Sequence, residues 1–218
     1  MRYDLIIFDL DGTLLNTIGD LAEAANVMLG KRDLPQHTYE EYCTFVGNGI
    51  MRLVERALPE EQRTTERVAA AREDFLSYYI DHIDRKTKPY EGIVQLLNDL
   101  QAEGVSLAVA SNKFQAGTRK LIQRFFPEIG WVAIYGQRPD VPLKPDPAVV
   151  EEILSEVKIP RERVLYVGDS GVDIETAHRA GIKAVGVTWG FRSRSELEAA
   201  GADRIVDCAE EILSLCQA

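Results

Sequence analysis

The stretch LIIFDLDGT, residues 5–13, constrains the fold of this chain more than any other segment. Its apolar run is typical of a buried strand, and the run ends in two acidic residues, Asp9 and Asp11. Residues two apart in an extended chain point to the same side, so both carboxylates can approach one point above the strand end. Two carboxylates this close repel each other. The stretch therefore predicts a buried strand ending where a positive charge offsets that repulsion.

Short apolar runs recur along the chain, each bounded by Gly, Ser or Asp, as buried parallel strands are. They cover residues 3–8, 105–110, 164–167 and 183–187, with weaker runs at 131–135 and 204–206. Helical patterns fill the gaps, at 92–103, 115–126, 147–157, 172–180 and 209–215. This alternation of strand and helix predicts an α/β fold with a doubly wound parallel sheet, a Rossmann-like core.

About seventy residues with almost no strand pattern separate the first strand from this alternation. Within them, residues 20–29, 39–46, 49–58 and 65–82 read as helices. We therefore predict an inserted all-α cap domain at 16–83 and a catalytic core at 1–15 and 84–218. Because the insertion begins just after the two acids, the cap should lie over the carboxyl end of the strand, where doubly wound folds bind ligands.

Charge and composition exclude several classes of partner. The 218 residues carry a formal net charge of −10, which argues against nucleic acid or an anionic membrane as the main partner. No window approaches a membrane span, and the N-terminal residues do not resemble a signal peptide. The three cysteines lack a paired spacing, which indicates free thiols in a reducing compartment. We expect a cytoplasmic protein, of an oligomeric state that the sequence leaves open.

A second acidic motif, GDSGVD at residues 168–173, follows the strand at 164–167. Asp169 stands at that strand's carboxyl end, and Asp173 lies one helical turn later, so both can face the same site. Asp169 alone reads equally well as a helix N-cap. Together with Asp9 and Asp11, it favours a site for a hard cation, and carboxylate oxygens suit Mg²⁺.

Three further polar residues suit the binding of negative charge. Ser111 and Asn112 follow the strand at 105–110, where they can grip a phosphate oxygen or simply cap the next helix. Lys144 stands in LKPDP, residues 143–147, where two prolines fix the backbone around it. A rigidly presented ammonium group is suited to stabilising an anion.

The motifs at residues 9–13, at Ser111, at Lys144 and at residues 168–173 resemble, in order, the four motifs of the haloacid dehalogenase-like hydrolase superfamily. The resemblance covers essentially the whole chain, and the position of the insertion is similar to that in the subfamily with a helical cap. Within it, residues 14–17, 46–49 and 144–147 look most like those of phosphoglycolate phosphatases.

The resemblance implies a phosphoric monoester hydrolase that works through an aspartyl-phosphate. Asp9 would be the nucleophile. Asp11 would protonate the leaving alcohol and then activate water. Mg²⁺ would be held by Asp9, the main-chain carbonyl of Asp11 and Asp169. Asp173 would act through water or by orienting Lys144.

The resemblance also implies that Ser111, Asn112 and Lys144 bind the transferring phosphoryl group of a small phosphorylated metabolite, with phosphoglycolate as the first candidate. The cap segment at residues 46–49 could hold the carboxylate of that substrate at Asn48 and the start of the next helix, with help from Arg52. Alternatively, Asn48 merely caps that helix.

Two other functions share these motifs. A sugar-phosphate mutase of the β-phosphoglucomutase kind would pass the phosphoryl group to a sugar instead of water. A non-catalytic binding module would keep the fold without the chemistry, although both Asp9 and Asp11 are present.

Overall fold

The structure is a computed structural model and describes residues 2–217. Its main sheet contains six parallel strands in the order β5-β4-β1-β6-β7-β8. These strands are β1 (Leu5–Phe8), β4 (Ser106–Phe114), β5 (Trp131–Gln137), β6 (Val164–Gly168), β7 (Lys183–Val187) and β8 (Arg204–Val206). The arrangement confirms the predicted doubly wound parallel sheet.

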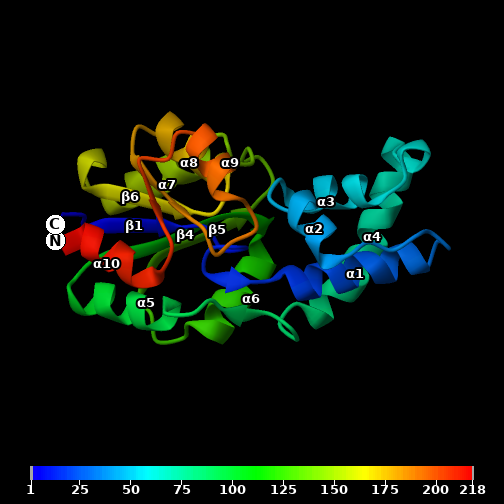
Figure 1. The fold of residues 1–218 in the computed structure, drawn as a ribbon, viewed down its shortest axis with the longest axis horizontal. Helices are drawn as coiled ribbons and strands as arrows, with labels where there is room; N and C mark the ends of the chain where they lie inside the picture. The colour runs from blue at the N-terminus through cyan, green and yellow to red at the C-terminus, as the bar shows by residue number, and fades with distance from the viewer. Residues whose placement is uncertain (1, 218) are drawn as a thin grey trace.

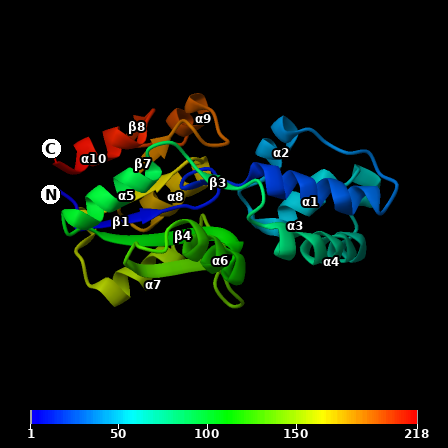
Figure 2. The ribbon, with the colours of Figure 1, turned by 90° about the horizontal axis from the view of Figure 1, so that it is seen from below.

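Helices cover both faces of this sheet (Figures 1 and 2). One face packs against α5 (Ile93–Ala102), α6 (Gln115–Phe125) and α10 (Ala209–Gln217), and the other against α7 (Ala148–Val157), α8 (Gly171–Arg179) and α9 (Arg194–Ala199). Side chains alternate between the two faces along a strand. In β1, Ile6 and Phe8 therefore enter the first core and Leu5 and Ile7 the second, and all four are fully buried. This explains the uninterrupted apolar run of the sequence.

The central strand β1 lies between β4 and β6, at the point where the strand order reverses. Phe8 is level with Val109 of β4 and Val167 of β6, so the carboxyl ends of the three strands meet at one edge. The backbone N–H of Asp9 donates to Val167 at 2.9 Å, which extends this register to the first acid. Ligands bind at such a reversal in open α/β sheets.

Four helices lie together beyond this edge of the sheet (Figure 1). They are α1 (Ile18–Gly30), α2 (Tyr39–Phe45), α3 (Gly49–Ala57) and α4 (Thr65–His82), and a short 3-10 helix (Glu60–Gln62) precedes α4. Thr38 and Glu41 form a reciprocal capping box at the start of α2, and Thr64 caps α4. The division into core residues 1–15 and 84–218 and cap residues 16–83 stays a prediction.

The chain crosses between sheet and helices through two adjacent segments. These segments pair as a two-stranded antiparallel sheet of β2 (Leu15–Asn16) and β3 (Lys88–Pro89). The buried carboxylate of Asp20 accepts hydrogen bonds from the backbone N–H groups of Lys86 and Thr87, which ties the returning segment to α1.

A second 3-10 helix (Arg161–Arg163) lies before β6. Across residues 2–217, no helix has both the length and the apolar character needed to cross a bilayer.

Candidate active site

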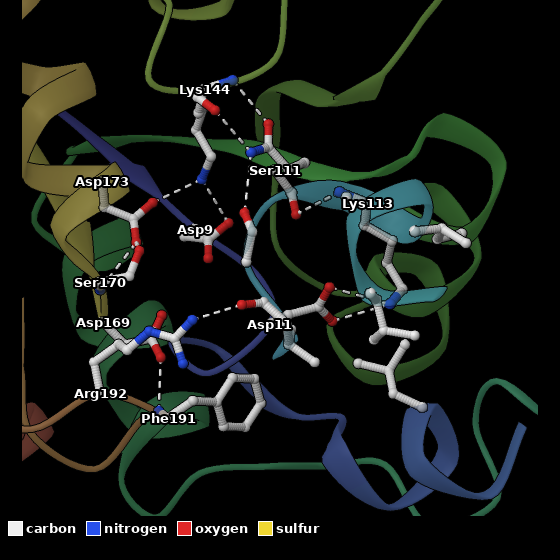
Figure 3. Close-up of a pocket in the computed structure, with 17 residues that line it drawn as sticks. Asp9, Asp11, Ser111, Lys113, Lys144, Asp169, Ser170, Asp173, Phe191 and Arg192 are labelled. Carbon is white, nitrogen blue, oxygen red and sulfur yellow. Dashed lines mark hydrogen bonds and ion pairs between the residues drawn. The ribbon is translucent and has the colours of Figure 1, made fainter. Parts of the chain in front are cut away.

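A pocket lies between the carboxyl ends of the strands and the helical segment (Figure 3). The helical side contributes mainly apolar surface and backbone, from Leu21, Val46, Gly47, Gly49, Ile50 and Leu53. The sheet side contributes charged and polar side chains, from Asp9, Asp11, Ser111, Asn112, Lys113, Lys144, Asp169, Ser170 and Asp173, together with Phe191 and Arg192. Most of the polar residues singled out from the sequence thus share one pocket, and Asn48 and Arg52 are the exceptions described below.

Lys144 occupies the centre of the sheet side. Its Nζ lies 2.8 Å from Oδ1 of Asp9 and 2.7 Å from Oδ1 of Asp173, and it also donates to the carbonyl of Ala110 at 2.9 Å. Only 3% of the side chain is exposed. Burial opposes its charge, but the carboxylates of Asp173 and Asp9 outweigh burial and hold the pKa of Lys144 well above its usual value.

Asn112 fixes the backbone that carries Lys144. Its Oδ1 accepts from the Lys144 N–H at 2.9 Å, and its Nδ2 donates to the Lys144 carbonyl at 3.1 Å. The same Nδ2 donates to the carbonyl of Gly47 in the helical segment at 3.1 Å. The side-chain amide of Asn112 thus binds two backbone segments. Ser111 also lines the pocket, and its Oγ accepts a hydrogen bond from the backbone N–H of Lys113 at 3.2 Å.

Three buried carboxylates gather beside Lys144. Oxygens of Asp9, Asp169 and Asp173 lie within 4.8 Å of one another. Burial raises the pKa of Asp9 to about 7, and burial with the nearby charges of Asp173 and Asp9 raises the pKa of Asp169 well above its usual value. Three carboxylates and one ammonium group leave two negative charges when all are ionised. This acidic cluster therefore fits a divalent cation, which would neutralise it.

Close packing against glycine fixes Asp169. Its Oδ2 accepts from the backbone N–H of Phe191 at 2.7 Å. A Cβ on Gly190 would lie 2.2 Å from the Cβ of Asp169, and a Cβ on Gly12 would lie 2.2 Å from its Oδ2. Gly12 also has a φ of 91°, which disfavours other residues. The glycine of the first motif is thus required both by its turn and by the acid of the last motif.

Asp11 stands apart from the three clustered acids and pairs with Lys113. The Lys113 Nζ lies 3.0 Å and 3.1 Å from the two oxygens of Asp11 and donates to the Tyr79 hydroxyl at 2.6 Å (Figure 3 shows the pair with Asp11). Sequence reasoning assigned no role to Lys113 because it expected the strand to end at residue 110. In the structure β4 continues to Phe114 with an irregular register after Ala110, and Lys113 lines the pocket together with Ser111 and Asn112. The position of Lys113 directly after these two residues was the available signal.

Asn48 lies between two pocket-lining glycines, but its side chain is directed elsewhere. Its Oδ1 accepts from Nη2 of Arg56 at 2.9 Å, and it makes no side-chain capping bond to α3. Gly49 and Ile50 of the first turn of α3 line the pocket, so the N-terminal end of this helix borders it. Arg52 pairs with Glu55 at 2.5 Å, and 63% of its side chain is exposed.

Arg192 is a second residue that sequence reasoning missed. It follows β7 in a loop without a charged motif, and it crosses to the helical segment. Its guanidinium donates to the carbonyl of Cys43 and, at 2.6 Å, to that of Val46. Two residues from the sheet side of the pocket, Arg192 and Asn112, thus tie the segment at residues 43–47 to that side by hydrogen bonds to its carbonyl groups.

Comparison with known proteins agrees with this geometry. Residues 6–187 match the family model described as haloacid dehalogenase-like hydrolase. The chain therefore belongs to the haloacid dehalogenase-like hydrolase family, as its motifs predict.

Within this family, the chain is similar over nearly its whole length to proteins named phosphoglycolate phosphatase. The phosphoglycolate phosphatase of Mesorhizobium japonicum is 35% identical over 199 residues, which cover 89% of this chain and 86% of the relative. That of Mannheimia succiniciproducens is 32% identical and covers 98% of both chains. A crystal structure from Lactobacillus delbrueckii subsp. bulgaricus superimposes with a TM-score of 0.93 at 33% identity, covering 99% of both chains. The relatives confirm the predicted class of enzyme, a phosphoric monoester hydrolase similar to phosphoglycolate phosphatase.

Proposed function

We propose that this protein is a Mg²⁺-dependent phosphatase that hydrolyses phosphoglycolate, or a closely similar small phosphorylated metabolite, through an aspartyl-phosphate. The observation that carries the proposal is the cluster of Asp9, Asp169 and Asp173 around Lys144 at the reversal of the strand order. Phosphoryl transfer depends mainly on positioning and on neutralising charge, and this cluster combines a nucleophile with both.

In the first step, a carboxylate oxygen of Asp9 attacks phosphorus. The bond from phosphorus to the leaving oxygen breaks, its electron pair stays with that oxygen, and Asp11 supplies the proton. Lys144 and Ser111 hold the phosphoryl oxygens, while Asn112 keeps Lys144 in place through its two backbone bonds.

In the second step, Asp11 takes a proton from water as the water oxygen bonds to phosphorus. The bond from phosphorus to Asp9 breaks, and its electrons restore the carboxylate, so inorganic phosphate leaves and the enzyme is regenerated. A mutase would instead offer a sugar hydroxyl at this step.

Asp9, Asp169 and the main-chain carbonyl of Asp11 are the proposed ligands of Mg²⁺, with Asp173 orienting Lys144. The ion would neutralise phosphoryl oxygens and keep Asp9 ionised. Support comes from the two negative charges that Lys144 leaves uncompensated in the cluster.

The substrate carboxylate is proposed to lie at the start of α3, near Asn48. The first turn of α3 lines the pocket, the first N–H groups of a helix have no partner within it, and the helix dipole favours an anion there. The remaining pocket surface on this side is apolar and suits a small leaving group.

The function is tested by phosphate release from phosphoglycolate, glycerol phosphate and glucose phosphate, each in Mg²⁺ and in EDTA. We expect phosphoglycolate to give the highest kcat/KM and EDTA to abolish turnover until Mg²⁺ is restored. Turnover of no phosphate ester, or equal turnover in EDTA, would contradict the proposal.

The cytoplasm is the proposed compartment, supported by three free cysteines.

A further inference from the structure

A chain of contacts runs from the helical segment to the proposed acid–base residue. Lys113, near the end of β4, contacts both oxygens of Asp11. Tyr79, on α4, accepts a hydrogen bond from the same ammonium group. We propose that Lys113 and Tyr79 are positioning residues that orient Asp11 for proton transfer, so that general acid–base catalysis depends on a contact between core and cap. This inference rests on the proposed function, in which Asp11 is the acid and base.

The contacts leave Lys113 no freedom to act elsewhere. Only 1% of its side chain and none of Tyr79 is exposed, whereas 14% of the Asp11 side chain remains open to the pocket. The two oxygens of Asp11 and the Tyr79 hydroxyl can engage all three ammonium protons. Lys113 is therefore committed to Asp11, in contrast to Lys144, which contacts the nucleophile.

A general acid must present one particular oxygen to the leaving group within hydrogen-bond reach. Asp11 precedes the turn at Gly12, and its carboxyl torsion is intrinsically broad. When Asp11 is protonated, Lys113 can retain the unprotonated oxygen, and the other oxygen then faces the leaving group with its proton. When Asp11 acts as the base, its two oxygens share one negative charge, and the ammonium group compensates that charge.

Aromatic packing fixes Tyr79 at the junction between α4 and β4. Its ring lies 5.1 Å from that of Phe75 and 6.3 Å from that of Phe114, which is the residue after Lys113. The Lys113 Nζ also lies 4.9 Å from the centre of the Tyr79 ring. A shift of α4 away from the sheet would break these contacts and the hydrogen bond from Lys113 to Tyr79. The orientation of Asp11 therefore depends on the position of α4.

The test compares two substrates that differ in their need for an acid. The leaving group of p-nitrophenyl phosphate departs without a proton, whereas that of phosphoglycolate, an alkyl phosphate, needs one. The value of kcat/KM covers only the steps up to departure of the leaving group. For phosphoglycolate, we expect kcat/KM to fall about 10²-fold in Lys113→Met and about tenfold in Tyr79→Phe, with less than about a threefold change for p-nitrophenyl phosphate.

Tyr42→Phe is the matched control, because Tyr42 is a fully buried cap tyrosine whose hydroxyl donates to Asn26 at 2.7 Å outside the pocket. It should leave the ratio of the two kcat/KM values unchanged. Should Lys113→Met fail to fold, Tyr79→Phe, which loses only a hydroxyl, carries the test.

Asp11→Asn separates the two ways in which the account can fail. If Asp11→Asn changes the ratio but neither Tyr79→Phe nor Lys113→Met does, the positioning role is overturned and the acid role stands. If Asp11→Asn leaves the ratio unchanged, both are overturned. If Lys113→Met acts through Asp11, adding it to Asp11→Asn should cause no further loss, and an additive loss would overturn the inference.

Discussion

Asp9 combines burial, a contact with Lys144 and membership of the acidic cluster in one side chain. Its neighbours explain how a carboxylate with a pKa raised to about 7 by burial can still serve as a nucleophile. Lys144 favours its ionised form, and the proposed cation would favour it further. Reactivity at this residue is therefore a property of the whole cluster.

We predict that Asp9→Asn lowers kcat by at least about 10⁴-fold, because an amide cannot form the covalent intermediate. The fold should persist, since Lys144 keeps its contact with Asp173. Asp4→Asn is the control, because Asp4 precedes the other end of the same strand and pairs there with Arg163. Steady-state kinetics with thermal melting of each variant tests this, and appreciable turnover by folded Asp9→Asn would refute the role.

At the scale of elements, the sequence predicts those that have a strong pattern. The six strands of the main sheet and nine of the ten α-helices in residues 2–217 fall on predicted segments. Strands β2 and β3 were not predicted, because each has two residues, too few for any periodicity to appear. Helix α9 has only six residues and one buried side chain, so it carries no apolar stripe.

The site was predictable where residues follow strand ends and unpredictable where they depend on tertiary contact. Asp9 and Asp169 directly follow the neighbouring strands β1 and β6, and Ser111 lies three residues before the end of the adjacent strand β4, so topology brings them together. Arg192 reaches the pocket through a loop whose path the sequence does not reveal. Lys113 was overlooked because the strand was expected to end at residue 110, whereas β4 continues to Phe114.

The segment between α2 and α3 gives a prediction at this scale. Arg56 donates to the carbonyl of Phe45 and to the side chain of Asn48, and so holds the segment that leads into α3. Removing the second bond in Asn48→Ala should loosen that segment. We expect kcat/KM for phosphoglycolate to fall about tenfold, with little change for p-nitrophenyl phosphate, as a small misplacement of binding groups would produce.

Arg52→Ala is the control for this variant, because Arg52 is exposed and pairs with Glu55 one helical turn away. It should leave both substrates unaffected. If Asn48→Ala affects both substrates equally, or neither, the segment does not recognise the carboxylate, and phosphoglycolate loses its structural support.

At the scale of the whole molecule, the acidic cluster links stability to pH. In the absence of a metal, burial raises the pKa of Asp9 to about 7 in the folded state, against about 3.8 for an aspartate exposed to water. The folded state therefore binds more protons than the unfolded state between about pH 4 and pH 7. The contribution of Asp9 to the free energy of unfolding must fall as pH rises through this window, by at most about 4 kcal/mol.

We predict that, in EDTA, Asp9→Asn gains stability relative to the wild type as pH rises from 5 to 8. Urea unfolding at several pH values measures this difference, and the comparison cancels groups that titrate equally in both proteins. Saturating Mg²⁺ should reverse the trend, because the ion stabilises the ionised wild type by mass action. A difference that is constant with pH would show that Asp9 is not buried with a raised pKa.

The most direct test of covalent phosphoryl transfer is a rapid-mixing measurement with Asp11→Asn and p-nitrophenyl phosphate in Mg²⁺. The leaving group needs no acid, so Asp9 should still be phosphorylated, whereas hydrolysis lacks its base. We predict a burst of about one equivalent of p-nitrophenolate per enzyme, followed by slow turnover. The double variant that carries both Asp11→Asn and Asp9→Asn should show no burst. Nitrophenolate and phosphate appearing together from the start, with no burst and no phosphoryl group on Asp9, would contradict the account.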